Sequence, residues 1–177
     1  MDHLTTNESY FYRELKQIMD LVELVKKSSA DISILCAPSS TGEEPYSIAI
    51  ALLEAGVHPS KFKILGIDIN AQVIFKAKEA IYIQEHMRNL SPQIISKYFA
   101  MEHEKYTLSQ SVKSLVSFEV INLFDESLKA IGKFDFVFSR NMLIYFDKET
   151  KLKAKKILDN LRKNEINDVF FGHADLF

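Results

Sequence analysis

The sequence predicts an α/β protein with a mostly parallel, doubly wound sheet and a small irregular β insertion. Two apolar runs, at residues 32–37 (ISILCA) and 63–68 (KILGID), are of the kind that a parallel sheet buries on both faces. Each run is followed by polar turn residues and then by apolar residues at helical spacing. Strands that alternate with helices in this way pair in parallel, because each connection crosses one face of the sheet.

The first elements can be justified one by one. A helix is expected to start near Asn7, because Thr5 and Glu8 have capping-box spacing and a stripe of apolar residues follows. After the first strand, Pro45 suits the first position of an amphipathic helix, and Gly56 suits its left-handed C-cap.

The second half of the chain continues the alternation. The segment Tyr98–Val120 is less regular than its surroundings and predicts a small β-subdomain within a single domain that covers residues 1–177. The other expected elements are helices at 71–81, 91–99 and 148–162 and strands at 116–120, 134–139 and 169–172.

Composition excludes several classes of function. The chain has 177 residues, 47% of them hydrophobic and 26% charged, which is typical of an ordinary globular protein. Its net charge of -2 argues against a nucleic-acid partner. No apolar run approaches the roughly 20 residues that span a bilayer, so no direct membrane insertion is expected. The single cysteine, Cys36, favours a reducing, cytoplasmic location, and the five histidines show no metal-ligand spacing.

The turn Ser39–Gly42 links the first strand to the next helix. Such a turn directs free backbone N–H groups toward the carboxyl edge of a sheet, where nucleotide-like ligands bind. Glu43 and Glu44 follow directly and would repel a phosphate, so a neutral or cationic adenosine-bearing ligand fits better. Capping-box spacing selects Glu43 from Ser40 but Glu44 from Thr41, and either glutamate has a purely structural alternative.

Asp68 ends the second strand, somewhat over 20 residues after Gly42. An acidic residue at this position of a doubly wound fold accepts hydrogen bonds from ribose hydroxyls. The alternative is that Asp68 only caps the turn that leads into the next helix.

Four ordered blocks resemble the chemotaxis receptor methyltransferases, which methylate glutamate side chains with S-adenosylmethionine. The blocks are TTNESYFYRE (5–14), STGEEPYSIA (40–49), INLFD (121–125) and FDFVFSRNMLIYFDKET (134–150), and the closing GHADLF (172–177) resembles the family's ending. The resemblance implies a class I, Rossmann-like methyltransferase fold with S-adenosylmethionine as cofactor. The family's N-terminal helical domain is expected to be absent, since only four residues precede the first block.

The resemblance also implies roles for particular residues. Arg13 and Tyr145 would be catalytic. The structural alternatives are a surface ion pair for Arg13 and a core aromatic for Tyr145. Ser9 replaces the family's commoner threonine and retains the hydroxyl, and Leu123 has the alternative of simple burial. The implied cofactor-binding residues are Asn7, Ser9, Arg13, Glu44, Asp68, Asn122, Leu123, Arg140 and Asn141.

By this resemblance the partners are the cytoplasmic domains of chemotaxis receptors, and the protein is expected to be a monomer. A glutamate carboxylate is ionised at neutral pH, with an unperturbed pKa of about 4.3, so it needs no general base before it attacks a methyl group. An inactive S-adenosylmethionine-binding regulatory module is the alternative. An oxidoreductase is disfavoured because no Gly-x-Gly-x-x-Gly turn follows the first strand, and amine methylation because no Asn-Pro-Pro-Tyr-like block is present.

Overall fold

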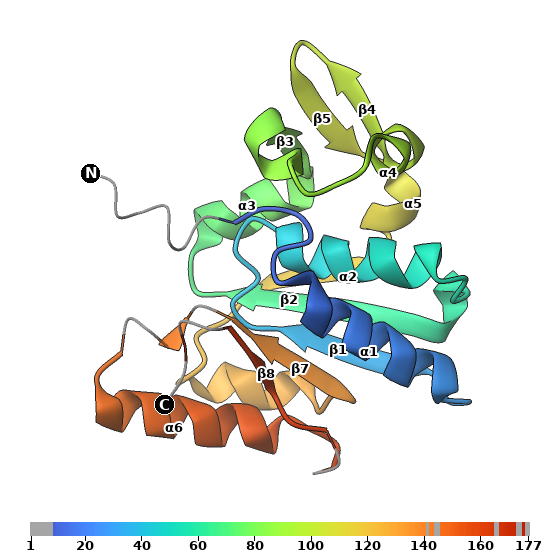
Figure 1. Cartoon of the computed structure of the whole chain (residues 1–177). Coiled ribbons are helices and arrows are strands. Elements are labelled where there is room, and N and C mark those ends of the chain that lie inside the picture. Colours follow the sequence, from blue (N-terminus) through green and yellow to red (C-terminus); the bar gives the residue numbers. More distant parts are fainter. Residues whose placement is uncertain (1–8, 141, 144–145, 165–166, 173–174, 176–177) are drawn as a thin grey trace.

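The computed structural model describes residues 9–140, 142–143, 146–164, 167–172 and 175. Five parallel strands form the main sheet in the order β6-β2-β1-β7-β8 (Figure 1). This order places the first strand at the centre and confirms the predicted doubly wound α/β sheet. The strands are β1 (Ile32–Cys36), β2 (Phe62–Asp68), β6 (Val116–Val120), β7 (Phe136–Ser139) and β8 (Phe170–Phe171).

Helices cover both faces of this sheet. Because side chains alternate along a strand, Ile34 and Cys36 of β1 belong to one apolar cluster and Leu35 to another. The first cluster packs under helices α1 (Leu15–Lys27), α2 (Glu43–Glu54) and α3 (Ala71–Glu79), and the second under α6 (Lys148–Asn160) and the 3-10 helix η4 (Glu126–Ile131). Figure 1 shows α1 and α2 on one side of the sheet and α6 on the other.

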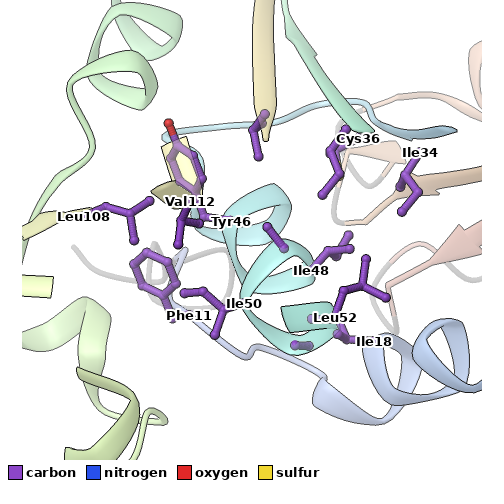
Figure 2. Packing of buried hydrophobic residues seen from close by; sticks show 14 of the residues in the cluster. Phe11, Ile18, Ile34, Cys36, Tyr46, Ile48, Ile50, Leu52, Leu108 and Val112 are labelled. Carbon is purple, nitrogen blue, oxygen red and sulfur yellow. The ribbon is translucent and has the colours of Figure 1, made fainter. Parts of the chain in front are cut away.

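Helix α2 is enclosed on nearly every side. The predicted helix is confirmed, but nine of its twelve residues are buried, so its predicted amphipathic character is wrong. Figure 2 shows why: Ile48 and Leu52 lie near Ile34 of β1, whereas Ile50 points toward Phe11 and the residues around the small sheet. A helix that is apolar all round is typical of a position between two packed layers.

A small antiparallel sheet lies beside α2 and away from α6 (Figure 1). It contains β3 (Ile81–Ile83), β5 (Lys105–Leu108) and β4 (Phe99–Glu102), in that order. The irregular segment Tyr98–Val120 therefore supplies two of these strands, while its last strand, β6, pairs with β2 in the main sheet. The remaining short elements are η2 (Pro59–Lys61), η3 (Gln84–Met87), α4 (Pro92–Tyr98) and α5 (Gln110–Lys113).

Two predicted helix starts are wrong. Helix α1 begins at Leu15, and among the described residues before it, 9–10 have no regular structure and 11–14 form a turn. The turn places Phe11, fully buried, against the ring of Tyr82 at 4.8 Å between centroids, so packing ends the helical path there. Helix α2 starts at Glu43 rather than Pro45, whereas Gly56 has the predicted left-handed conformation, with φ of 85°.

Over the described ranges, no helix is both long and apolar enough to cross a membrane. The same residues contain no group of three or more histidine, cysteine, aspartate or glutamate side chains that could hold a metal ion. Cys36 is fully buried, and burial raises the pKa of its thiol well above the ordinary value.

Candidate active site

The loop between β1 and α2 lies against the carboxyl ends of the strands. Its backbone is held from both neighbours, because Ala37 N–H donates to the Phe138 carbonyl of β7 at 2.9 Å and Ser39 N–H to the Ile67 carbonyl of β2 at 2.8 Å. The loop therefore crosses the edge of the sheet where doubly wound folds bind their ligands.

Two glycines permit this close approach. A Cβ on Gly66 of β2 would lie 2.7 Å from the Ser39 Cβ, so a side chain there would push the loop away. Gly42 precedes α2 with φ of +98°, and a Cβ there would meet the Tyr46 ring at 2.9 Å. Both positions need glycine because the backbone conformation or the available space excludes other residues.

Asp68 stands at the end of β2 and lines two adjoining cavities. Its Oδ2 accepts from the Ser40 N–H at 3.1 Å and its Oδ1 from the Asn70 N–H at 3.0 Å. Both interpretations of Asp68 from the sequence are thus compatible with the structure: the carboxylate caps the following turn and also faces the ligand cavities. Each carboxylate oxygen can accept a further hydrogen bond, as a ribose hydroxyl would require.

The first cavity, here called the polar cavity, has a volume of about 180 Å³. Its wall combines hydroxyl groups, carboxylates and two guanidinium groups, a donor set suited to a ligand that carries charges of both signs. It is lined by Ser9, Tyr10, Arg13, Pro38, Ser39, Ser40, Glu43, Glu44, Asp68 and Arg140.

An ion pair between Glu44 and Arg140 joins α2 to the end of β7. Arg140 Nε donates to Glu44 Oε2 at 2.5 Å, and the Arg140 side chain is only 2% exposed. Burial acts to lower the pKa of this guanidinium, but the Glu44 carboxylate raises that pKa above its usual value. Arg140 Nη1 also donates to the Glu14 carbonyl and to Gln17 Oε1, each at 3.1 Å. Glu44 Oε1 is buried and has no hydrogen-bond partner within the described part of the chain.

Ser9 and Arg13 reach the polar cavity from the segment before α1. Neither residue lies in a helix, although the sequence predicts a helix that starts near Asn7. Ser9 Oγ nevertheless donates to Ser40 Oγ at 3.2 Å, and Arg13 lies 5.7 Å from the centre of the Tyr10 ring. Both predicted residues therefore reach the cavity from a non-helical segment.

The second cavity, here called the apolar cavity, has a volume of about 670 Å³ and shares Pro38 and Asp68 with the first. Asn122 and Leu123 lie on its wall: Asn122 Oδ1 accepts from the Phe124 N–H at 3.0 Å, and Leu123 is buried. A cavity of this size with few polar groups suits a flat heterocycle such as adenine. Its other lining residues are Ala37, Ile67, Ile69, Asn70, Val73, Ile121, Phe124, Met142 and Phe146.

The predicted site residues Asn7, Asn141 and Tyr145 lie outside the described residues. Of the rest, Ser9, Arg13, Glu44, Asp68 and Arg140 line the polar cavity, and Asn122 and Leu123 line the apolar one.

Sequence reasoning missed two kinds of residue. One is Gln17, whose amide accepts from Arg140 and donates to the Phe171 carbonyl at 2.7 Å, and no local pattern indicated it. The other is the apolar wall that contains Ile69 and Val73. The apolar residues that follow the end of β2 are a signal that could have found this wall.

The cavities therefore fit a ligand with three parts: a flat ring for the apolar cavity, hydroxyl groups that can bind the Asp68 carboxylate, and a polar end that carries charges of both signs. S-adenosylmethionine has these parts in this order. Asp68 stands where the two cavities meet, so it would hold the ribose, while the buried Glu44 Oε1 and the nearby guanidinium groups would face the amino-acid end.

Comparisons with known proteins agree with this fit. Residues 7–177 match the family model described as CheR methyltransferase, SAM binding domain. The chain is 39% identical to a chemotaxis protein methyltransferase of Campylobacter jejuni over 99% of this chain and 66% of the relative. It is 34% identical to the Escherichia coli chemotaxis protein methyltransferase, covering 100% of this chain and 63% of the relative.

A probable biofilm formation methyltransferase, WspC of Pseudomonas putida, is 36% identical over 95% of this chain and 41% of its own length. The chain thus spans less than two thirds of the length of each of these three relatives.

Proposed function

Because the chain belongs to the CheR methyltransferase family, as its S-adenosylmethionine-binding domain, we propose that it methylates glutamate side chains of chemotaxis receptors. The products are glutamate methyl esters and S-adenosylhomocysteine. The observation that carries the proposal is the polar cavity, where Asp68, the Glu44–Arg140 pair and Arg13 meet at the carboxyl edge of the sheet. The proposed partners are the cytoplasmic domains of the receptors, and the proposed location is the cytoplasm.

The chemistry makes modest demands on the protein. When bound, S-adenosylmethionine supplies an activated methyl group on a sulfonium. Since the acceptor carboxylate is already ionised, the chain's residues bind, orient and exclude water, and they need not remove a proton. Arg13 lines the cavity and is proposed to orient the acceptor carboxylate, while Arg140 is held by Glu44 and Gln17 and keeps the cavity wall in place.

The proposal is tested by binding and then by product chemistry. Titration calorimetry with S-adenosylhomocysteine measures whether the chain binds the cofactor product. Labelled S-adenosylmethionine is then incubated with the protein and receptor-containing membranes, and the labelled receptor is treated with mild alkali. A glutamate ester releases labelled methanol. A label that resists alkali would assign the transfer to an amine and contradict the proposal.

Tyr145, although outside the described residues, is proposed as the second catalytic group. Tyr145→Phe deletes only the hydroxyl, so we expect turnover to fall about tenfold while affinity for S-adenosylhomocysteine changes little. The measurement is steady-state methyl transfer together with calorimetry on the same preparation. Full activity would exclude a role for the hydroxyl, and parallel losses of binding and melting temperature would assign Tyr145 to the structure.

A further inference from the structure

Glu43, the neighbour of Glu44, has an environment that the proposed function does not explain. Its side chain lines the polar cavity but is almost completely buried, at 1% exposure. Its Oε1 accepts a hydrogen bond from the Thr41 hydroxyl at 2.5 Å, while its Oε2 has no hydrogen-bond partner within the described residues. A buried carboxylate oxygen without a donor is costly unless a charge or a ligand compensates for it.

An ionisable group of η3, the 3-10 helix that follows β3, lies close to this oxygen. His86 Nε2, in η3, lies 4.0 Å from Glu43 Oε2, and the His86 side chain is about 29% exposed. The other ring nitrogen, Nδ1, is buried and has no hydrogen-bond partner in the described ranges. The two groups are therefore close enough for the charge of one to affect how readily the other binds a proton.

The position of His86 is fixed by its neighbours. Its carbonyl accepts from the Phe11 N–H at 2.9 Å, and its ring meets the Tyr82 ring edge-on at 5.9 Å between centroids. Tyr82 in turn donates its hydroxyl to the Thr41 carbonyl at 2.7 Å, in the loop that precedes Glu43. Tyr82 of the small sheet thus contacts both the His86 ring and the loop that precedes Glu43.

We infer that Glu43 and His86 form a charge-coupled pair that makes the polar cavity discriminate between S-adenosylmethionine and S-adenosylhomocysteine. This inference rests on the proposed function, because it assumes that both molecules bind in that cavity. Methyl transfer converts a positive sulfonium into a neutral thioether. An anionic wall therefore attracts the substrate more strongly than the product, and a neutral wall does not.

The charge of the pair depends on pH in a direction that can be stated. While the two groups share one proton, the pair is neutral, whichever group holds the proton. When that proton leaves as the pH rises, the pair carries one negative charge. Burial raises the pKa of the Glu43 carboxyl, and the Thr41 hydroxyl and His86 act to lower it, which is consistent with two groups that compete for a proton.

The other charged groups around Glu43 do not produce the same effect. Burial raises the pKa of Tyr82 well above its ordinary value, so this phenol stays neutral. The other ionisable groups of the cavity wall are Tyr10, Arg13, Glu44, Asp68 and Arg140. Among the side-chain types around Glu43, histidine is the one whose ordinary pKa lies near neutral pH.

The experiment is calorimetric titration of the protein with S-adenosylmethionine and with S-adenosylhomocysteine from pH 6 to pH 9. The measured quantity is the ratio of the two affinities. Because each variant is compared with the parent at the same pH, ionisation of the ligands themselves cancels. At pH 9, Glu43→Gln should reduce the preference for S-adenosylmethionine about tenfold, since the wall no longer becomes negative.

His86→Gln keeps the glutamate but removes its proton-sharing partner, so the pH midpoint of the affinity ratio should move. The matched control is His103→Gln. His103 also lies 4.0 Å from a glutamate, Glu102, but that pair is fully solvated, with side-chain exposures of 90% and 85%. The affinity ratio of His103→Gln, plotted against pH, should coincide with that of the parent. Because His86 is partly exposed, this variant still tests the pair if Glu43→Gln fails to fold.

The inference is overturned if the ratio in Glu43→Gln stays within about twofold of the parent at pH 9, or if the His86→Gln curve coincides with the parent curve. Both results leave the proposed function intact, because both ligands still bind. Failure of the parent protein to bind either ligand would instead overturn the proposed function and, with it, this inference.

Discussion

The polar and apolar cavities share Asp68, but different forces hold their walls in place. The wall of the polar cavity is assembled from four distant segments and depends on the buried ion pair between Glu44 and Arg140, which are 96 residues apart. The apolar cavity is likewise lined by four segments, at or just after the carboxyl ends of β1, β2, β6 and β7, but most of its lining side chains are apolar and no ion pair joins its wall among the described residues. The difference shows that the polar wall should be sensitive to a single charge, whereas the apolar wall should tolerate small losses of packing.

The largest expected effect comes from Arg140→Met. This change leaves Glu44 without its cation and Gln17 without a donor, so the free energy of unfolding should fall by about 3–5 kcal/mol. Urea denaturation followed by circular dichroism measures the loss. Lys16→Met is the control, because Lys16 forms an exposed pair with Asp20, and it should have no measurable effect. Equal stability of the two variants would show that the buried pair does not support the polar wall.

Asp68→Ala tests the junction of the two cavities. Affinity for S-adenosylhomocysteine should weaken by about 1–3 kcal/mol if a hydrogen bond from ribose to the carboxylate is lost. Calorimetry gives the affinity, and Asp135→Ala is the matched control. Asp135 also accepts from a backbone N–H, that of Ser33 at 2.8 Å, but it lies at the opposite end of β1. If both variants bind as tightly as the parent, Asp68 only caps its turn.

The smallest effect is expected in the apolar wall. Val73→Ala removes two methyl groups next to the site expected for adenine, and affinity should fall by about 1 kcal/mol with little change in stability. Val120→Ala serves as the control, since Val120 is 51% exposed and is not part of either cavity wall. A loss as large as that of Asp68→Ala would mean that packing dominates recognition in both cavities.

Most of the sheet could be predicted because its signals are local. The apolar runs before Ala37 and at the end of β2 are short and bounded by turn residues, and the strands were found within one or two residues of their expected bounds. Asp68 and the loop before α2 follow from the same pattern, since parallel strands bring their carboxyl ends to one edge. That the chain forms a single domain remains a prediction.

Prediction failed where long-range packing overrides local preference. Tyr12 and Glu14 have left-handed backbone conformations, with φ of 60° and 47°, and capping patterns give no sign of the turn that they form. That turn allows Phe11 to pack against Tyr82 and Phe99 of the small sheet. Likewise, the N-cap of α2 is Gly42, which has no side chain, so α2 lacks the side-chain cap that capping-box spacing suggests.

The amino-acid sequence by itself determined the alternation of strands and helices, the carboxylate at the end of β2 and the pair of glutamates that opens α2. Only the tertiary structure decided what the two glutamates do. Glu44 meets Arg140, which directly follows β7, and Glu43 is buried beside His86 of η3. Strand patterns repeat over a few residues, so they can be read locally. The partner of a buried charge is chosen by which distant element packs against it, and no local spacing encodes that choice.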